Sequence, residues 1–385
     1  MVRKRRFILI STSFIVLFLI TVLFLIKNNY QKLQKTESRA SGNIYQVEPS
    51  PTPNPLYVEH KLAVALVKLG NSAKYSEYEF NNMPSIIYNM LFTDDNSLNR
   101  YFQEISNGQI YFSGKVYGWY DLSNENFNCD YEKLDEAVRN LLQIDAPNDD
   151  VIFSSLYNHL IYVYAGIPEC LKRGNESLGA AYPGLRVSWV YDPVNKLHTY
   201  IHEIGHNFWL DHADLDVRMK ENKEIDFLQM IGFDPYDPMN FGDNIFHFNA
   251  PHKAALGIIP ENQILTFDES YISNSPNGIF ETEIIAHEIN GAGIKIIRIP
   301  VLDNNTDKYY FFSFRKQTGF DNGLPASVTQ GINIHTARYN AFNTLFWESF
   351  TLKDGESFQN KEIGYSVYQV SHTENSVKIL ISKKL

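Results

Sequence analysis

A fifteen-residue stretch that ends at His212 constrains this chain more than any other feature. It holds four of the eleven histidines and contains the pattern H-E-x-x-H. Two histidines four positions apart project from the same face of an α-helix, so both imidazoles can reach one metal ion. A catalytic zinc site takes three protein ligands and leaves one position for water. The sequence therefore predicts a helix with His202 and His206 as zinc ligands and Glu203 as the general base for that water.

The third ligand is expected to be His212. It lies six residues after His206, so an unbroken helix would turn it away from the metal. The chain must therefore leave the helix near Trp209. Glycine usually makes such a turn, because a left-handed backbone is cheap only for glycine. A carboxylate further along the chain is the rival third ligand, and the candidates are Asp214, Glu221 and Glu224.

A turn rich in proline and aspartate follows at residues 234–240, with the sequence D-P-Y-D-P-M-N. Met239, at its tip, is expected to form an apolar floor beneath the three histidines. A loop methionine can also simply fill a gap in a core. Three further histidines are expected to be structural, although each lies near enough to contact a metal or a substrate: His198, His247 and His252.

Several segments together resemble the gametolysin family of metzincin peptidases. They are H-E-x-x-H-x-x-x-x-x-H at residues 202–212, D-P-M-N at residues 237–240 and F-N-A-P-H-K-A-A-L-G at residues 248–257. Upstream, L-N-R-Y-F-Q-E-I-S-N-G-Q at residues 98–109 and V-Y-G-W-Y at residues 116–120 resemble the part of that family that precedes the catalytic helix. The resemblance implies a membrane-anchored or secreted endopeptidase with one catalytic Zn²⁺ that hydrolyses surface, matrix or cell-wall proteins.

The same resemblance indicates where a substrate would bind. In metzincins the strand before the catalytic helix edges the cleft, and the substrate pairs with it as an added strand. Here that segment is Arg186–Val190. Ser188, Trp209 and Tyr236 are the expected cleft residues. Many metzincins place a tyrosine two residues after the turn methionine, but this chain has Phe241 there, and Tyr236 is the nearest substitute.

The N-terminus predicts a membrane anchor. Four basic residues precede an uncharged apolar run, Phe7–Ile26, and a run of this length spans about 30 Å as a helix. Basic residues before the span favour a cytoplasmic N-terminus. We therefore expect residues 1–27 to form a tail and a single-pass signal anchor, and the proline-rich residues 28–56 to form an extracellular stalk. Cleavage of the run as a signal peptide, which would release a secreted protein, is the alternative.

The rest of the chain predicts an α+β fold in two domains. Residues 57–262 are expected to form a metzincin-like peptidase domain, in which a twisted mixed sheet packs against the catalytic helix. Short alternating strands predict an antiparallel β-sandwich over residues 263–385. Within it, Asn290-Gly291 predicts a hairpin. Gln109–Leu122 also alternates aromatic and polar residues, as a hairpin would.

The composition excludes some classes of binding partner. The net charge of −10 argues against a nucleic-acid partner, and a glycine-rich phosphate loop is missing from the sequence, which argues against a nucleotide. The expected partners are a protein or peptide substrate outside the cell and the membrane, through one N-terminal helix. Cys129 and Cys170 are the only cysteines; outside the membrane they are expected to form a disulfide, with two buried thiols as the alternative.

A second function from another class stays open. The protein could be a surface binding or adhesion protein with a vestigial or structural zinc site. Trp209 in place of the turn glycine and Phe241 in place of the tyrosine are the features that favour it. Glu203 speaks against it, because a structural zinc site has no need of that carboxylate. A zinc hydrolase that cuts peptide cross-links of cell walls would share the peptidase site.

Overall fold

The computed structural model describes most of the chain after the expected stalk. Residues 52–385 form one compact unit. Within it the structure describes residues 58–70, 75–146, 158–167, 179–191, 196–215, 232–240, 242–302, 307–338, 344–346 and 351–383. The predicted membrane anchor and stalk lie outside these residues. Among the residues that are described, none of the helices is long and apolar enough to cross a membrane.

A five-stranded sheet lies in the first half of the described chain. Its strands are β1 (Val58–Lys68), β2 (Ile110–Asp121), β3 (Asn158–Ala165), β4 (Gly179–Ala181) and β5 (Val187–Val190). They lie side by side in the order β2-β1-β3-β5-β4. The first four strands in this order run parallel, and the edge strand β4 runs antiparallel to β5. The fold is thus mixed α+β from its first sheet onward.

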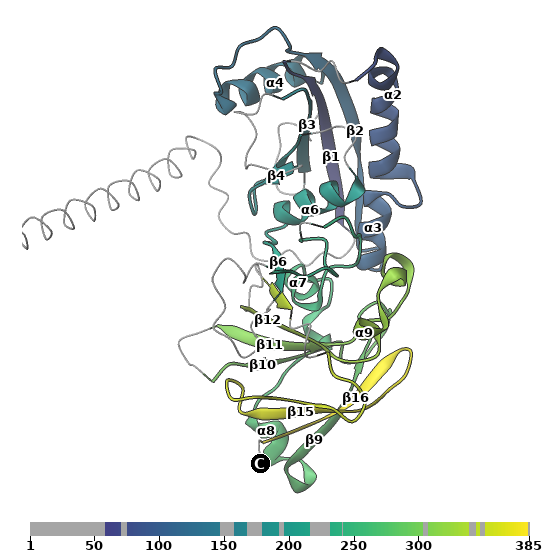
Figure 1. Ribbon diagram of the computed structural model, residues 1–385, viewed down its shortest axis with the longest axis vertical. Helices are drawn as coiled ribbons and strands as arrows, with labels where there is room; N and C mark the ends of the chain where they lie inside the picture. The colour runs from purple at the N-terminus through teal and green to yellow at the C-terminus, as the bar shows by residue number, and fades with distance from the viewer. Residues whose placement is uncertain are drawn as a thin grey trace, which may run out of the picture. The chain divides into compact units, whose positions relative to one another are not determined.

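Helices cover both faces of this sheet (Figure 1). One face packs against α2 (Glu77–Tyr88), the π-helical turn Asn89–Thr93, α3 (Leu98–Ile105) and α6 (Leu197–Asn207), and the other packs against α4 (Tyr131–Asp145). Strand β1 explains the two layers, because side chains alternate between the faces of a strand. Leu62, Val64 and Leu66 join one apolar cluster, and Ala63, Ala65 and Val67 join the other.

The expected hairpin at Gln109–Leu122 is wrong. These residues form the single long strand β2, which pairs in parallel with β1. The two glycines that interrupt the alternation mark a close approach of backbones instead of a turn. A Cβ atom at Gly114 would lie 1.9 Å from the Leu62 carbonyl oxygen, and one at Gly118 would lie 2.4 Å from the Leu66 carbonyl oxygen. Only glycine allows β2 to lie so close to its neighbour.

Two further sheets share one apolar core in the second half of the chain. The seven-stranded sheet has the order β7-β6-β13-β12-β11-β10-β8, and the four-stranded sheet has the order β14-β15-β16-β9. Their strands are β6 (Ala213–Leu215), β7 (Gly232–Phe233), β8 (Ile264–Thr266), β9 (Ile279–Ile285), β10 (Ile296–Pro300), β11 (Lys308–Ser313), β12 (Asn333–Arg338), β13 (Thr344–Phe346), β14 (Ser357–Asn360), β15 (Tyr365–His372) and β16 (Ser376–Lys383). Three short helices accompany them: α7 (Ala250–Ala255), α8 (Glu269–Ser273) and α9 (Ala326–Thr329).

These sheets differ from the predicted sandwich in two respects. The four-stranded sheet is antiparallel throughout, but the seven-stranded sheet contains the parallel pairs β8–β10 and β6–β13. Asn290-Gly291 does not close a hairpin, because β9 and β10 on either side of it belong to different sheets. Strands β6 and β7, which follow the predicted catalytic helix, also join the seven-stranded sheet, so that this sheet takes strands from both sides of residue 262.

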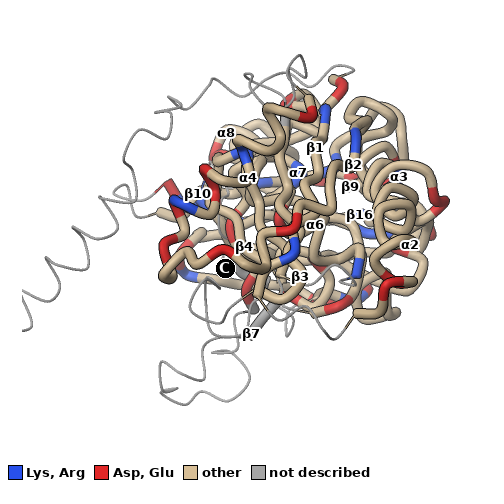
Figure 2. The backbone as a smooth tube through the Cα atoms, turned by 90° about the horizontal axis from the view of Figure 1, so that it is seen from above, with Lys and Arg blue, Asp and Glu red and all other residues tan. Residues whose placement is uncertain are grey.

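Acidic and basic residues are interspersed along the described backbone (Figure 2).

Candidate metal centre

Helix α6 presents two of the predicted ligands. All its residues are buried, and it packs against the five-stranded sheet. His202 and His206 stand one turn apart on it, and their ring centroids are 4.8 Å apart. This is the arrangement that a spacing of four residues predicts.

The chain leaves the helix directly after these two histidines. The amide of Trp209 donates to the His206 carbonyl at 2.9 Å, and the amide of Leu210 donates to the Gly205 carbonyl at 3.1 Å. Trp209 makes the turn in the left-handed region, with φ of 70°. The tryptophan therefore takes the conformation for which glycine is usual, and His212 reaches the other two histidines.

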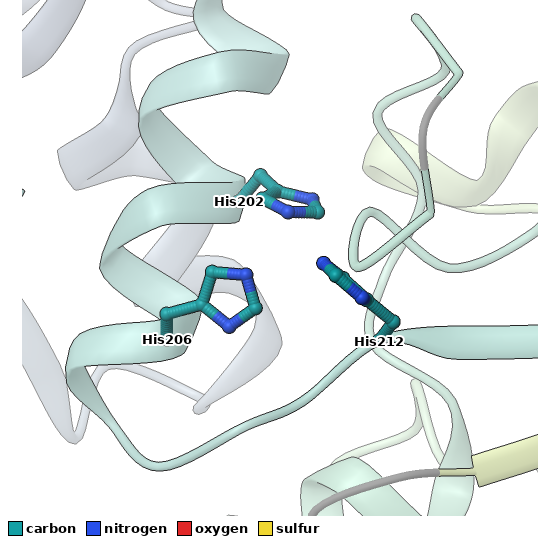
Figure 3. A group of neighbouring side chains, drawn as sticks. All are labelled: His202, His206 and His212. Atoms are coloured by element: carbon teal, nitrogen blue, oxygen red, sulfur yellow. The ribbon is translucent and has the colours of Figure 1, made fainter. Parts of the chain in front are cut away.

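Three imidazoles converge at this point (Figure 3). Each of His202, His206 and His212 offers a nitrogen, and these nitrogens lie within 4.8 Å of one another. The Nδ1 atom of His202 lies 2.9 Å from the Pro238 carbonyl oxygen, and that of His206 lies 2.7 Å from the Leu210 carbonyl oxygen. A carbonyl oxygen can only accept, so both Nδ1 atoms donate a proton. Their Nε2 atoms then carry the lone pairs that a metal needs.

Burial keeps the three imidazoles neutral at pH 7. It is the largest cause that lowers the pKa of His202 well below its usual value and lowers the pKa of His206 to about 4. Burial also lowers the pKa of His212. Neutral imidazole is the form that binds a metal, so the group needs no deprotonation before it can act as a ligand set. The donor set and its protonation therefore fit zinc.

Glu203 is the buried acid of the site. Its side chain is almost inaccessible, and burial raises its pKa well above the usual value for a carboxyl group. Its Oε2 atom has no hydrogen-bond partner among the described residues. A Cβ atom at Gly179 would lie 2.5 Å from Glu203 Oε1, so strand β4 passes beside this carboxylate only because residue 179 is glycine. An orphaned buried carboxylate is unusual, and it indicates a group that meets a ligand.

The proline-rich turn packs against helix α6 through Met239. The Met239 side chain is fully buried, and a Cβ atom at Gly205 would lie 2.3 Å from its Sδ atom. Glycine at position 205 thus allows the methionine to reach α6. The carboxylate of Asp237 holds the turn in shape. It accepts hydrogen bonds from the Met239 amide at 2.7 Å, the Asn249 amide at 2.6 Å and His252 Nδ1 at 2.9 Å.

The other predicted residues lie in different surroundings. His198 is not in the three-histidine group, although its ring centroid lies 5.9 Å from that of His202. Asp214 lies on β6 and is also outside the group. His252 binds the buried Asp237, which supports the structural role expected for it. Glu221, Glu224 and Phe241 lie outside the described residues.

The predicted position of the cleft edge is wrong. Arg186–Val190 contains strand β5, which has β3 on one side and β4 on the other and is therefore an interior strand. Ser188 is fully buried, and its hydroxyl donates to the Glu203 carbonyl oxygen at 3.4 Å. The edge strand beside α6 is β4, which sequence patterns did not reveal because it has only three residues. What links β4 to the site is the contact between Gly179 and Glu203, and this contact can be seen only in the folded structure.

Two of the expected cleft residues are accessible. Trp209 is 39% exposed, and Tyr236 is half-buried in the turn that contains Met239.

Cys129 is disulfide-bonded. The chain's only other cysteine, Cys170, lies outside the described residues.

A second group of potential ligands is buried elsewhere. His247, Glu288 and Asp321 also bring ligand atoms within 4.8 Å of one another. Two cations share this space. Lys253 Nζ lies 3.0 Å from His247 Nδ1, and Arg315 Nη2 donates to Asp321 Oδ1 at 2.7 Å. Arg315 thus balances the charge of Asp321.

Comparisons with known proteins give little guidance. No family model matches the chain, and no curated protein matches it. A solved structure described as a chaperone-substrate complex is similar with a TM-score of 0.28 and 15% sequence identity. That similarity covers 50% of this chain and 29% of the other chain. A TM-score of this size carries no argument about fold or function.

Proposed function

We propose that this protein is a zinc-dependent metalloendopeptidase with a metzincin-like catalytic domain. The observation that carries the proposal is the group of His202, His206 and His212, whose ligand nitrogens converge and stay neutral through burial. Three histidines form the donor set of open, catalytic zinc sites. Glu203 beside them, buried and without a hydrogen-bond partner for Oε2, supports a catalytic role over a purely structural one.

Glu203 would act as general base and then as general acid. A zinc ion held by the three imidazoles supplies Lewis-acid polarisation of the scissile carbonyl and lowers the pKa of water. Glu203 takes a proton from the attacking water and passes it to the leaving amine.

Strand β4 is the part of the chain that would hold the substrate. Among the described strands it pairs only with β5, so its other edge can accept an extended peptide. Gly179 of β4 lies against Glu203, which places the strand beside the base. A peptide paired with β4 would therefore run alongside the catalytic carboxylate.

The N-terminal segments complete the proposal. A signal anchor at residues 1–27 and a stalk at residues 28–56 would hold the catalytic unit outside the cell, where surface, matrix or cell-wall proteins are the substrates. The β-rich residues 263–385 would stabilise the catalytic domain and position the substrate. The alternative location is a secreted protein released by signal cleavage.

The proposal is tested by proteolysis with the compact unit of residues 52–385. A mixture of denatured proteins is incubated with the wild-type unit and with its Glu203→Gln variant. We expect cleavage by the wild type that a chelator blocks and zinc restores. Loss of the general base should slow cleavage by a factor on the order of 100 or more, while zinc remains bound.

The outcomes separate the enzyme from a binding protein. A Glu203→Gln variant that cleaves as fast as the wild type would contradict the assigned role of Glu203. A folded wild-type unit that binds zinc and cleaves nothing in the mixture would favour a surface binding protein with a structural zinc site, or a hydrolase restricted to cell-wall cross-links. Cleavage of isolated peptide cross-links would then distinguish these two.

A further inference from the structure

Trp209 adopts a backbone conformation that a bulky residue normally avoids. Its φ of 70° lies in the left-handed region, where a Cβ atom is crowded by the backbone. The conformation is required, because the chain must turn here to bring His212 to the other histidines. Glycine would make the same turn without strain. The turn therefore does not explain why this position carries a large aromatic side chain, and the indole ring is expected to have a separate role.

The indole ring lies directly on the backbone of Gly184. A Cβ atom at residue 184 would lie 2.1 Å from Trp209 Cε2 and 2.2 Å from its Cζ2. Gly184 also has a positive φ, of 77°. Its amide donates to the carbonyl of His206 at 2.9 Å. The turn around Gly184 is thus joined to the end of α6 by a ring contact and by a hydrogen bond.

This turn continues the edge strand β4. The amide of Leu185 donates to the carbonyl of Tyr182 at 2.9 Å, which closes the turn directly after Ala181. At its start, β4 touches the helix through Gly179 and Glu203. At its end, the turn touches the last turn of the helix through the Gly184 amide and the His206 carbonyl, and it touches the Trp209 ring directly after the helix. The segment from Gly179 to Gly184 is therefore attached to the metal-bearing helix at both ends.

We infer that Trp209 is a positioning residue that keeps the β4 edge ordered against helix α6, so that a peptide can pair with β4 beside Glu203. The inference rests on the proposed peptidase function and adds a substrate-positioning residue to it. The indole acts through the backbone of Gly184 and is not required for the metal ligands. Its removal should loosen the edge strand and leave the three-histidine group in place.

The first test replaces Trp209 with glycine in the full-length chain. Glycine keeps the left-handed turn, so we expect a folded protein with the same zinc stoichiometry as the wild type. Amide hydrogen exchange in residues 182–185 should become faster by about tenfold, which corresponds to the loss of one modest contact. For peptide cleavage, KM should rise by about the same factor while kcat stays unchanged, because substrate and transition state lose the same binding.

The second test uses Gly184. A methyl group there would collide with the indole ring, so Gly184→Ala alone should raise KM and speed exchange in the turn. Adding Gly184→Ala to Trp209→Gly should change either value less, because the collision with the ring is gone and only the strain of a Cβ atom at positive φ remains. Tyr78→Ala, which alters the strongly exposed aromatic side chain on α2, is the control and should change neither.

The outcomes are decisive for the inference. Unchanged exchange in residues 182–185 of the Trp209→Gly variant would overturn it, and so would faster exchange with an unchanged KM. Fully additive effects of the two substitutions would also overturn it. If the wild-type chain cleaves no peptide, the proposed function fails, yet the exchange measurement still tests the ring contact on its own.

Discussion

Two buried groups of histidines and carboxylates can be compared within this molecule. One consists of His202, His206 and His212, and the other of His247, Glu288 and Asp321. In both groups the ligand atoms lie within 4.8 Å of one another. Distance alone would therefore predict two metal sites.

The difference lies in the charges that accompany each group. The three imidazoles are neutral, so that the first group carries no charge that needs a partner. In the second group, Arg315 binds Asp321 and Lys253 lies against His247. Buried carboxylates that already have cationic partners have no need of a metal. A group of ligand atoms is therefore a weaker candidate for a metal site when cationic side chains of the protein already lie among them, as Arg315 and Lys253 do here.

The second group instead connects the β-rich region to the turn of Met239. Arg315, which follows β11, donates to the carbonyl of Tyr236 at 2.7 Å and to the carbonyl of His247 at 3.1 Å. Asp321 accepts from the His247 amide at 2.7 Å. These contacts join the turn to residues far away in sequence. Arg315 and Asp321 thus hold in place the turn that lies beside the candidate metal centre.

The largest effect is expected from Arg315→Met. Arg315 is buried, and its removal leaves the charge of Asp321 without its main partner. Breaking a buried ion pair in this way costs about 3–5 kcal/mol of the free energy of unfolding. Urea denaturation measures it. The control is Lys316→Met, which removes the neighbouring ion pair with the exposed Glu374 and should cost less than about 1 kcal/mol of the free energy of unfolding. Equal losses of unfolding free energy in the two variants would contradict the role given to Arg315.

The metal-free protein should lose stability in acid because of the buried group of three histidines, His202, His206 and His212. Burial lowers the pKa of His206 to about 4, so the unfolded chain binds its proton between pH 6.5 and 4 while the folded chain does not. The contribution of His206 is full above pH 6.5 and is lost as the pH falls towards 4, by up to about 3 kcal/mol. Urea denaturation of zinc-free protein at pH 7.5 and pH 5 measures this loss. His206→Gln should lose less stability over this range, and an unchanged slope would contradict the prediction.

A smaller effect is expected from Asp237→Asn. Asp237 orders the turn whose Pro238 carbonyl orients His202. Loss of a residue that orients a metal ligand typically weakens binding by about 10–100-fold. Competition with a zinc chelator measures the affinity. Asp243→Asn makes the same change nearby on an exposed side chain paired with Lys196, and it should leave the affinity unchanged. Weaker binding in both variants would mean that charge, and not the turn, is responsible.

The sequence allowed the grouping of the three histidines to be predicted because they lie close together in the chain. Helical spacing alone places His202 and His206 on one face, and the chain has only to turn once to add His212. The strand order could not be predicted in this way. Alternation in β2 is the same for a hairpin and for a parallel strand, and only the contacts of Gly114 and Gly118 with β1 decide between them. Strand β4 was not predicted as a strand, because three residues are too few to show an alternating pattern.

The most direct test of the account is a zinc titration of three proteins: the wild type, His206→Ala and Glu288→Gln. Burial raises the pKa of Glu288 to about 8, so a neutral amide should be tolerated at that position. We predict one zinc ion per chain in the wild type and in Glu288→Gln, and none held tightly by His206→Ala. Zinc retained by His206→Ala, or lost from a folded Glu288→Gln protein, would contradict the assignment of the metal centre to the three histidines.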